Sequence, residues 1–386
     1  MAMRQRTWKS VFLMGILIGI LWACSTKSAQ ETPNPQPTDG AGTNRQAMLT
    51  NIADNIILPG YANFETTFDD MLTRVDAFTA KPSKATLSDL RRAWATAYTE
   101  WQKVELYDVG PAERHTLRNF FNIYPANGIG IEEYISIGAS APLDVPAAYP
   151  RQGFPALDYL LNGLDSGDEA IVARYTSAPD AAKRLAYLKR ITTQMKTLFN
   201  TVYSEWTGGY RDTFVNCTGL DAGCSTSKLV NGYVMHYERY IRSGKFGIPS
   251  GAMTNGTPMP DKVEALYSKG LGLTLAKAAH TAAVDFFNGK GVKNGLEGPS
   301  LKTYLNGLNA KDSRTGTLLT DLINTQFNSV QDRLNTLKPS LYDEVTLNTA
   351  AVTSVYTEMQ KAIRMLKVDM TTAMSITITY TDNDGD

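Results

Sequence analysis

The stretch Leu87–Val104 reads LSDLRRAWATAYTEWQKV. Its apolar side chains recur at steps of three and four residues, at Leu87, Leu90, Trp94, Ala97, Trp101 and Val104. This spacing places them on one face of an α-helix, and such a face has to be buried against neighbouring elements. The stretch therefore predicts a long amphipathic helix that packs inside a helical bundle.

The same periodicity recurs on both sides of this helix and dominates the rest of the chain. Strand-like alternation is confined to Ser375–Tyr380, which favours one short extended segment. We therefore predict an all-α fold with little or no β structure. The helical stripes are Ile57, Tyr61, Phe64, Phe68, Leu72, Val75 and Phe78; Leu185, Leu188, Ile191, Met195, Leu198 and Val202; Val263, Leu266, Gly270 and Leu273; and Val352, Val355, Met359, Ile363, Leu366 and Met370.

Three segments rich in proline or glycine interrupt the helical pattern: Gly110–Gly153, Ser243–Pro260 and Asn288–Pro299. Loops of this length are uncommon inside compact domains and often carry function. We expect the segments that follow Gly110, Gly244 and Asn288 to shape the mouth of a binding site.

The length of the chain favours two domains, because one hydrophobic core rarely serves more than about 250–300 residues. The segments Pro155–Leu164 and Pro299–Leu308 share Pro, two Leu, Asn, Gly and a final Leu at a constant offset. This weak repeat indicates duplicated helical bundles, although chance similarity between helix ends is the alternative. The predicted domains are 47–215 and 225–386, with the boundary near Cys217–Cys224.

The first residues have the pattern of a bacterial lipoprotein leader. Arg4, Arg6 and Lys9 precede an uncharged stretch that is too short to span a bilayer, and the stretch ends in Leu-Trp-Ala-Cys24. Residues 1–24 are therefore predicted to be a signal peptide, with Cys24 as the lipid-attachment site; an ordinary secretion leader is the alternative. Residues 25–46 are poor in apolar side chains and are predicted to be a flexible tether.

Charge and cysteine content exclude some classes of protein. The whole chain has 38 basic and 38 acidic residues, so loss of the leader leaves a formal charge of about −3, and no basic patch of the kind that nucleic-acid binders carry is present. The sequence also lacks a nucleotide-binding fingerprint. Cys217 and Cys224 lie close together in a glycine-containing loop, which in an exported protein favours a local disulfide.

Four segments, in order along the chain, resemble the imelysin family. They are Trp94–Trp101 followed by Tyr107–Pro111, then Gly153–Leu161, then Tyr237–Pro249, and finally Ile376–Asp386. The resemblance implies two helical-bundle domains with a site between them, an envelope location and an association with iron acquisition. It also implies a peptidase centre built on a Gly-x-His-x-x-Glu signature.

This chain departs from that signature at both of its functional positions. The segment reads Gly153-Phe-Pro155-Ala-Leu-Asp158, so a proline stands where the family has histidine and an aspartate where it has glutamate. A proline ring offers no atom that can bind a metal or transfer a proton, but it suits the first turn of a helix. Asp158 either contacts a ligand or has a structural polar role in the inter-domain site, or it is an ordinary surface or capping residue of its helix.

Further candidates for the site come from charged and aromatic segments near the signature. Glu132 and Glu133 precede the signature, and either of them is a candidate to join Asp158 if it is not part of a solvated face. The candidates for ligand contacts are Gly153, Asp158, Glu132, Glu133, Glu100 and Glu105. Weak candidates for binding a metal ion, for which iron is the first choice, are His236, Glu238 and His280, although His280 also fits a packing position.

These observations lead to one hypothesis and two alternatives. The leading hypothesis is a binding lipoprotein without peptidase activity, anchored at the outer membrane facing the periplasm, that serves the uptake of metal or of a small ligand. The first alternative is a metallopeptidase with a substituted set of ligands. The second is a lipid-anchored scaffold for an outer-membrane transporter or another envelope partner.

Overall fold

The computed structural model describes residues 39–381, and within this range the fold is all-α, as predicted. Isolated β-bridges join Lys290 to Glu297 and Lys311 to Leu318, and the described residues form no strand. Ser375–Tyr380, the one expected extended segment, lies outside any helix and pairs with no sheet. The predicted signal peptide, with Cys24, lies outside the described residues. No helix within the described range is long and apolar enough to cross a membrane.

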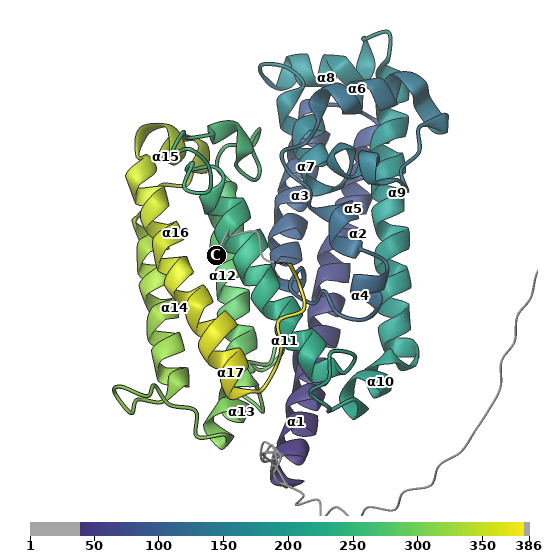
Figure 1. Ribbon diagram of the computed structural model, residues 1–386. Coiled ribbons are helices and arrows are strands. Elements are labelled where there is room, and N and C mark those ends of the chain that lie inside the picture. The colour runs from purple at the N-terminus through teal and green to yellow at the C-terminus, as the bar shows by residue number, and fades with distance from the viewer. Residues whose placement is uncertain (1–38, 382–386) are drawn as a thin grey trace, which may run out of the picture. The chain divides into compact units, whose positions relative to one another are not determined.

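The first part of the chain builds one group of helices, drawn from purple to teal in Figure 1. In this group α2 packs along α3, and α9 packs on α2. Its elements are α1 (Asp39–Asn51), η1 (Ile52–Ile57), α2 (Leu58–Ala80), α3 (Lys84–Val104), α4 (Pro111–Arg114), α5 (Leu117–Phe121), α6 (Gly128–Ile137), η2 (Gly138–Ser140), η3 (Pro146–Arg151), α7 (Gly153–Asp158), η4 (Tyr159–Gly163), α8 (Asp168–Thr176), α9 (Ala181–Glu205), η5 (Trp206–Tyr210) and α10 (Arg211–Asn216).

The second part builds another group, drawn from green to yellow, in which α16 packs on α14 and η6 (Figure 1). The two groups meet where α12 packs on α3 and where α13 packs on α1. Its elements are α11 (Ser225–Met235), η6 (His236–Gly247), η7 (Pro260–Lys262), α12 (Gly272–Asn288), α13 (Leu301–Gly307), α14 (Leu319–Thr336), α15 (Leu341–Leu347), α16 (Thr349–Arg364), η8 (Met365–Met370) and α17 (Thr371–Ala373). The predicted division into two domains at Cys217–Cys224 stays a prediction.

The apolar stripe of α3 is buried as the sequence predicts, and local chemistry fixes where the helix begins. Ser83 caps the helix by accepting from the backbone N–H of Thr86, and the Thr86 hydroxyl accepts from the backbone N–H of Ser83. This reciprocal pair satisfies two N–H groups that would otherwise be unbonded at the helix start. Trp101 stacks on Phe121 with ring centroids 4.4 Å apart, which anchors the helix in an aromatic core.

Helix α1 begins at Asp39, so it includes residues 39–46, which the sequence analysis assigned to the tether. Long-range contacts of Arg45 stabilise this segment, although its composition is polar. The Arg45 guanidinium donates to the Thr218 carbonyl at 2.6 Å and to the Tyr304 hydroxyl at 2.9 Å. Composition alone cannot reveal such partners, because they are more than 170 residues away along the chain.

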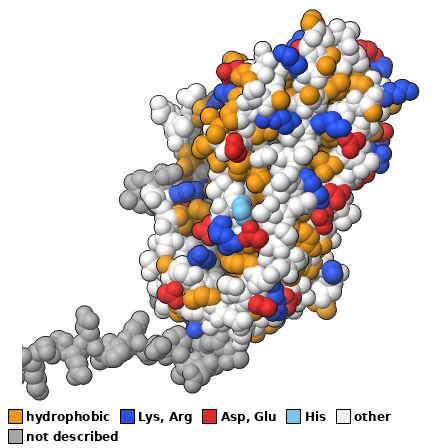
Figure 2. Space-filling view, turned by 90° about the vertical axis from the view of Figure 1, so that its right-hand side faces the viewer, with side chains coloured by type: hydrophobic (Ala, Val, Ile, Leu, Met, Phe, Trp, Pro, Cys, Tyr) orange, Lys and Arg blue, Asp and Glu red, His pale blue; other side chains and the backbone are white. Residues whose placement is uncertain are grey.

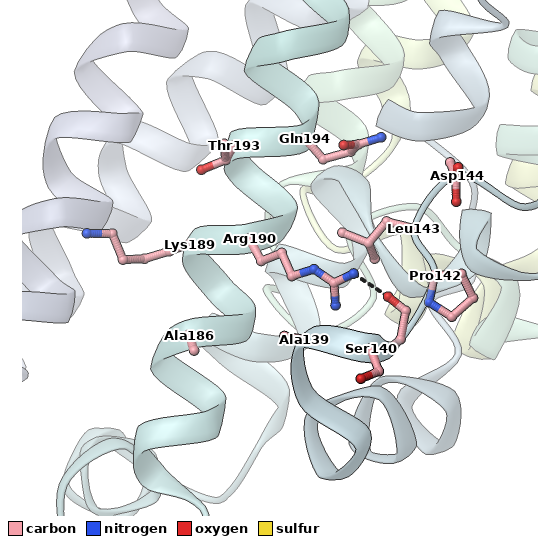
Figure 3. A pocket seen from close by; sticks show the side chains of 11 residues that line it. Ala139, Ser140, Pro142, Leu143, Asp144, Ala186, Lys189, Arg190, Thr193 and Gln194 are labelled. Carbon is pink, nitrogen blue, oxygen red and sulfur yellow. Dashed lines mark hydrogen bonds between the residues drawn. The ribbon is translucent and has the colours of Figure 1, made fainter.

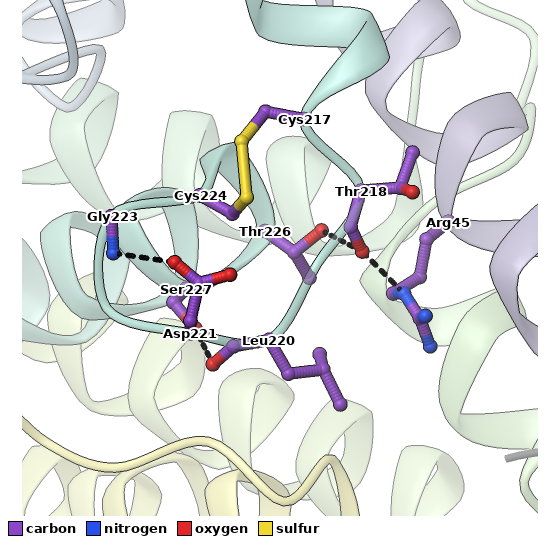
Figure 4. Close-up of a disulfide and its surroundings, with 9 residues drawn as sticks. All are labelled: Arg45, Cys217, Thr218, Leu220, Asp221, Gly223, Cys224, Thr226 and Ser227. Carbon is purple, nitrogen blue, oxygen red and sulfur yellow. Dashed lines mark hydrogen bonds between the residues drawn. A yellow bond between two sulfur atoms is a disulfide. The ribbon is translucent and has the colours of Figure 1, made fainter. Parts of the chain in front are cut away.

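The predicted disulfide between Cys217 and Cys224 is present in the loop between α10 and α11 (Figure 4). The Ser227 hydroxyl donates to the Leu220 carbonyl at 2.6 Å and closes the same loop. The loop is therefore fixed by a covalent bond and by hydrogen bonds where the chain passes from the first helical group to the second.

Two sequence-based assignments of secondary structure are wrong. The segment Gly110–Gly153 contains the short helices α4 to α6 as well as η2 and η3, because its prolines tend to start helices rather than exclude them, as Pro111 and Pro146 do. In contrast, Val263–Gly270 is a series of turns although it has a helical stripe. Ala265 and Lys269 adopt positive φ angles of 55° and 56°, which no α-helix allows.

Candidate functional site

The signature segment forms helix α7, and its geometry explains two of its residues. Gly153 has a φ of 79°, and a Cβ atom at this position would lie 2.4 Å from the Phe121 carbonyl oxygen. Only glycine fits such a position. Pro155 is buried in the first turn of the helix, where the missing N–H costs nothing. Both residues therefore have structural roles.

Helix α7 is attached to α3 by the residue between these two. Phe154 stacks on Tyr98 with ring centroids 4.6 Å apart, and its carbonyl accepts a hydrogen bond from the Trp94 indole N–H at 3.2 Å. The signature helix consequently lies directly beside the α3 face that carries Tyr98.

Asp158 is 1 % exposed and bonds to the backbone of the second helical group. Its two carboxylate oxygens accept from the backbone N–H groups of Tyr267 at 2.8 Å and Ser268 at 2.9 Å, and Asn162 donates to it at 3.0 Å. Burial raises the pKa of Asp158 to about 7, although these hydrogen bonds act to lower it. In the structure the Asp158 carboxylate joins the signature helix to the turn that carries Tyr267 and Ser268.

The turn that Asp158 holds also positions Glu264, a buried carboxylate that the sequence analysis missed. Glu264 lies three residues before Tyr267 and is 1 % exposed. Gly163 allows Tyr267 to approach the signature region, because a Cβ there would lie 2.4 Å from the tyrosine ring. Asp158 therefore acts through this turn on the position of the Glu264 side chain.

Glu264 is the centre of a buried group of polar side chains between the two helical groups, which we call the polar cluster. One oxygen of Glu264 accepts from Tyr98 at 3.0 Å and from Gln102 at 3.1 Å. Its other oxygen pairs with the ammonium of Lys245. The members of the polar cluster are Tyr98, Gln102, Glu105, Arg118, Asn122, His236, Lys245 and Glu264, all of them buried except for the partly exposed Arg118.

Asn122 joins the two carboxylates of the cluster. Its amide donates to Glu264 at 2.9 Å and to Glu105 at 3.1 Å. Glu105 forms an ion pair with the Arg118 guanidinium at 3.1 Å. Burial raises the pKa of Glu105, while Arg118 and Lys245 act in the opposite direction. The cluster thus contains two carboxylates and two cations, so its formal charges balance.

Two of the cluster residues lie on η6, a π-helix whose hydrogen bonds reach one residue further than those of an α-helix. Such turns are rare in proteins, and those that occur are often found at functional sites. They bring residues four and five apart onto one side, as in His236, Tyr240 and Lys245. The Arg118 guanidinium lies 3.3 Å from the centroid of the Tyr240 ring. The ring centroids of His236 and Tyr240 are 5.7 Å apart.

His236 differs from the other members of the cluster because neither of its ring nitrogens has a hydrogen-bond partner among residues 39–381. The side chain is 2 % exposed. Burial, and then the charges of Arg118 and Lys245, hold its pKa well below the ordinary value, so the imidazole is neutral. A neutral imidazole offers one donor and one acceptor, and leaving both unbonded in the interior costs about 1–3 kcal/mol each.

The remaining candidates from the sequence do not gather around Asp158. Glu132 binds Arg184 at 2.7 Å, Glu133 pairs with Arg151 at 3.1 Å, and Glu100 pairs with Lys103 on the far side of α3. Glu238 pairs with Lys367 at 3.0 Å. Among the ligand candidates other than Asp158 and Gly153, only Glu105 belongs to the polar cluster.

His280, the other buried histidine, has a partner at each nitrogen, namely the Tyr237 hydroxyl at 3.0 Å and the Phe327 carbonyl at 3.1 Å. It therefore has the packing role that the sequence favoured. Nowhere in the described part of the chain do three His, Cys, Asp or Glu side chains converge as a metal ion would require. The residues present do not fit a bare metal ion.

A hollow of about 740 Å³ lies elsewhere, beside α9 and the segment 139–144 (Figure 3). The Arg190 side chain reaches across it, and its guanidinium donates to the carbonyls of Gly138 and Ala141. Its charged group is thus used to fasten the chain after α6, and the hollow does not include the signature residues. We therefore place the candidate site at the polar cluster.

The Imelysin family model matches residues 57–370, which includes α2, the signature helix and the π-helix η6. The chain belongs to the imelysin family. This confirms the resemblance, whose four segments also lie in both helical groups.

Two solved structures of this family share the fold. An imelysin-like protein from Psychrobacter arcticum has a TM-score of 0.67, with 17% identity, over 88% of this chain and 98% of its own. A structure described as an iron-regulated protein A precursor from Parabacteroides distasonis has a TM-score of 0.66, also with 17% identity, over 88% of this chain and 96% of its own.

A similarity in sequence extends to a curated protein, the iron-regulated protein A of Synechococcus elongatus. The two chains are 24% identical over 121 residues, which is 30% of this chain. The match spans about a third (33%) of the length of that relative. The imelysin chain described here is thus similar to proteins named for regulation by iron.

Proposed function

We propose that this imelysin chain is a lipid-anchored binding protein of the bacterial envelope, without peptidase activity, that serves iron acquisition. Its ligand would contact His236 at the polar cluster, between the two helical groups. The observation that carries the proposal is the buried imidazole of His236, whose two nitrogens lack partners in the described structure. Buried polar groups nearly always have partners, so a buried group without one marks a place where a ligand can supply them.

The state of the signature supports binding rather than hydrolysis. A hydrolytic metal centre needs several protein ligands and an open position. Pro155 has no donor atom, and both oxygens of Asp158 are occupied by backbone N–H groups. Pro155 therefore supplies neither a metal ligand nor a general base, and the Asp158 carboxylate is held in place as an acceptor of backbone N–H groups.

The charges around His236 favour an anionic ligand over a bare cation. Arg118 and Lys245 are the charged residues that act most strongly on its ring. The partly exposed Arg118 and the buried Lys245 act against a bare metal ion at this ring, and a ligand carboxylate would share these cations with their partners Glu105 and Glu264. Iron would therefore enter this site as a chelate with carboxylate groups, and the similarity to a protein named for regulation by iron supports such a cargo.

Thermal unfolding of the purified full-length protein tests the binding site. Ferric citrate, citrate alone and ferric chloride serve as probes, because a ligand that binds only the folded state raises the unfolding temperature. We expect ferric citrate or citrate to raise it and ferric chloride to have no effect. His236→Leu should abolish this shift without destabilising the free protein, since it removes two unsatisfied groups. Failure of all three probes to change the unfolding temperature would count against the site.

His280→Leu is the matched control, because it changes the same residue type at another buried position whose nitrogens are both bonded. It should destabilise the protein and leave the response to ligand intact. If both variants lose the response equally, the effect is one of general stability and the assignment of the site fails.

A peptide-cleavage assay with added Zn²⁺ or Fe²⁺ separates the binding protein from the alternatives. We expect no turnover. Metal-dependent cleavage that disappears in Asp158→Ala would instead establish a metallopeptidase with a substituted ligand set. Co-purification of an outer-membrane transporter, with no response to any probe, would favour the scaffold.

A further inference from the structure

A second site lies on the other face of α3, away from the polar cluster. Tyr98, Gln102 and Glu105 face the cluster, whereas Lys103 and Tyr107 line a cleft of about 480 Å³. The cleft is bounded by α2, α3, α12 and the loop 290–295, so both helical groups contribute walls. Its volume falls in the range of small-molecule sites.

The loop wall of this cleft is fixed in place by hydrogen bonds to the first helical group. The Asn51 amide donates to the carbonyls of Gly289 at 3.2 Å and Pro299 at 2.9 Å. The backbone N–H of Val292 donates to the Asn55 carbonyl at 2.8 Å. A ligand would therefore meet a preformed wall and would not have to order a loose loop, which favours affinity.

The floor of the cleft is formed by two aromatic side chains and by small alanine side chains. Tyr107 and Phe286 lie with their ring centroids 6.0 Å apart and their planes inclined by 35°. Ala278 and Ala282, one turn apart on α12, line the same space with methyl groups only. This combination leaves room for a flat ring beside aromatic side chains.

The rim of the cleft carries an excess of positive charge. Glu100 pairs with Lys103, and Asp285 lies 3.4 Å from Lys290. Lys277, half-buried on α12, lines the cleft as well and forms no ion pair with any described residue. Its ammonium can therefore pair with an incoming anion without first breaking an existing ion pair.

We propose that this cleft binds a small aromatic carboxylate. The ring lies over Ala278 and Ala282 against Tyr107 and Phe286, and the carboxylate pairs with Lys277. This site is independent of the polar cluster and does not rest on the function proposed above.

Calorimetric titration of the purified full-length protein with naphthoate, and with the neutral analogue naphthalenemethanol, tests the proposal. We expect saturable binding of naphthoate with one site per chain, and binding of the alcohol weaker by roughly tenfold, which is the usual scale for a hydrogen bond to a charged partner. Lys277→Gln should weaken naphthoate binding by a similar factor and leave the alcohol unaffected. Ala282→Phe should abolish binding of both, because it fills the space.

Lys311→Gln, an exposed loop substitution outside the cleft, is the matched control and should bind naphthoate like the wild type. Absence of saturable naphthoate binding overturns the proposal, and so does equal affinity in the wild type and Lys277→Gln. If Ala282→Phe does not fold, Lys277→Gln decides alone. His236→Leu should retain naphthoate binding, so failure of the polar-cluster site and failure of this one give different results.

Discussion

Each face of α3 lies beside a glutamate–lysine pair, but one pair is buried and the other is accessible to solvent. On one face, the polar cluster buries Glu264 and Lys245 at 1 % exposure each and surrounds them with hydrogen bonds. On the other face, Glu100 and Lys103 form a solvent-accessible pair at the rim of a cleft. Chemical type therefore does not decide the role of a charged pair in this protein. Burial and the number of fixed partners decide it.

Breaking the buried pair should have the largest effect. Lys245→Met leaves the Glu264 carboxylate in the interior without its cation, and we expect a loss of about 3–5 kcal/mol in the free energy of unfolding. Denaturant unfolding followed by circular dichroism measures this loss. The double variant Lys245→Met/Glu264→Leu should recover much of it, because no unpaired charge remains. A single variant that unfolds like the wild type would show that the two faces do not differ in this respect.

The Asp158 contact, which holds the turn that carries Glu264, should make stability depend on pH. Because the pKa of Asp158 is about 7 in the folded protein against an ordinary 3.8, the folded state binds the proton more tightly than the unfolded state does. The stabilisation from this group is therefore complete below about pH 4 and is lost as the pH rises to about 7. Between pH 4 and pH 8, we expect the free energy of unfolding of the wild type to fall by about 2–4 kcal/mol relative to that of Asp158→Asn. Denaturant unfolding at each pH measures this difference.

Comparison of the two proteins across the same pH range is essential, since other buried groups also titrate. Burial raises the pKa of Asp108 to about 6, and both proteins share this group. Parallel pH profiles for the wild type and Asp158→Asn would show that the carboxylate contributes nothing to the pH dependence.

Substitution in the exposed pair should have the smallest effect. Glu100→Gln removes one partner of Lys103 on the helix surface, and such pairs contribute about 0.3–0.5 kcal/mol. The same unfolding experiment measures the change, and added salt should reduce it further. A loss as large as that of Lys245→Met would show that the cleft face is as tightly coupled to the fold as the cluster is.

The sequence predicted the helices well because burial of an apolar face leaves a periodic signature in each segment by itself. It failed at Val263–Gly270, where the periodicity is helical but the positive φ angles of Ala265 and Lys269 produce turns. The turn is held by Asp158, more than 100 residues earlier in the chain, and a local pattern carries no information about such a partner.

The polar cluster was found only in part for the same reason. Glu105 and His236 were among the candidates, but Gln102, Asn122 and Glu264 were missed because their partners come from distant segments. One signal was present in the sequence. Tyr98, Gln102 and Glu105 continue a second periodic face of the α3 helix, and polar residues at buried positions of a helix usually mark a network between elements.

The contact of Arg45 with Thr218 has a mechanical consequence. Arg45 lies in the middle of α1, and the carbonyl that it holds belongs to the loop closed by Cys217 and Cys224. Its second partner, Tyr304, lies on α13. A pulling force applied to the chain ahead of Asp39 would thus be shared at once among the first helix, the cross-linked loop and the second group. From Arg45 onward, α1 would therefore not unwind turn by turn, and the protein should resist extraction from that end better than the polar composition of this helix implies.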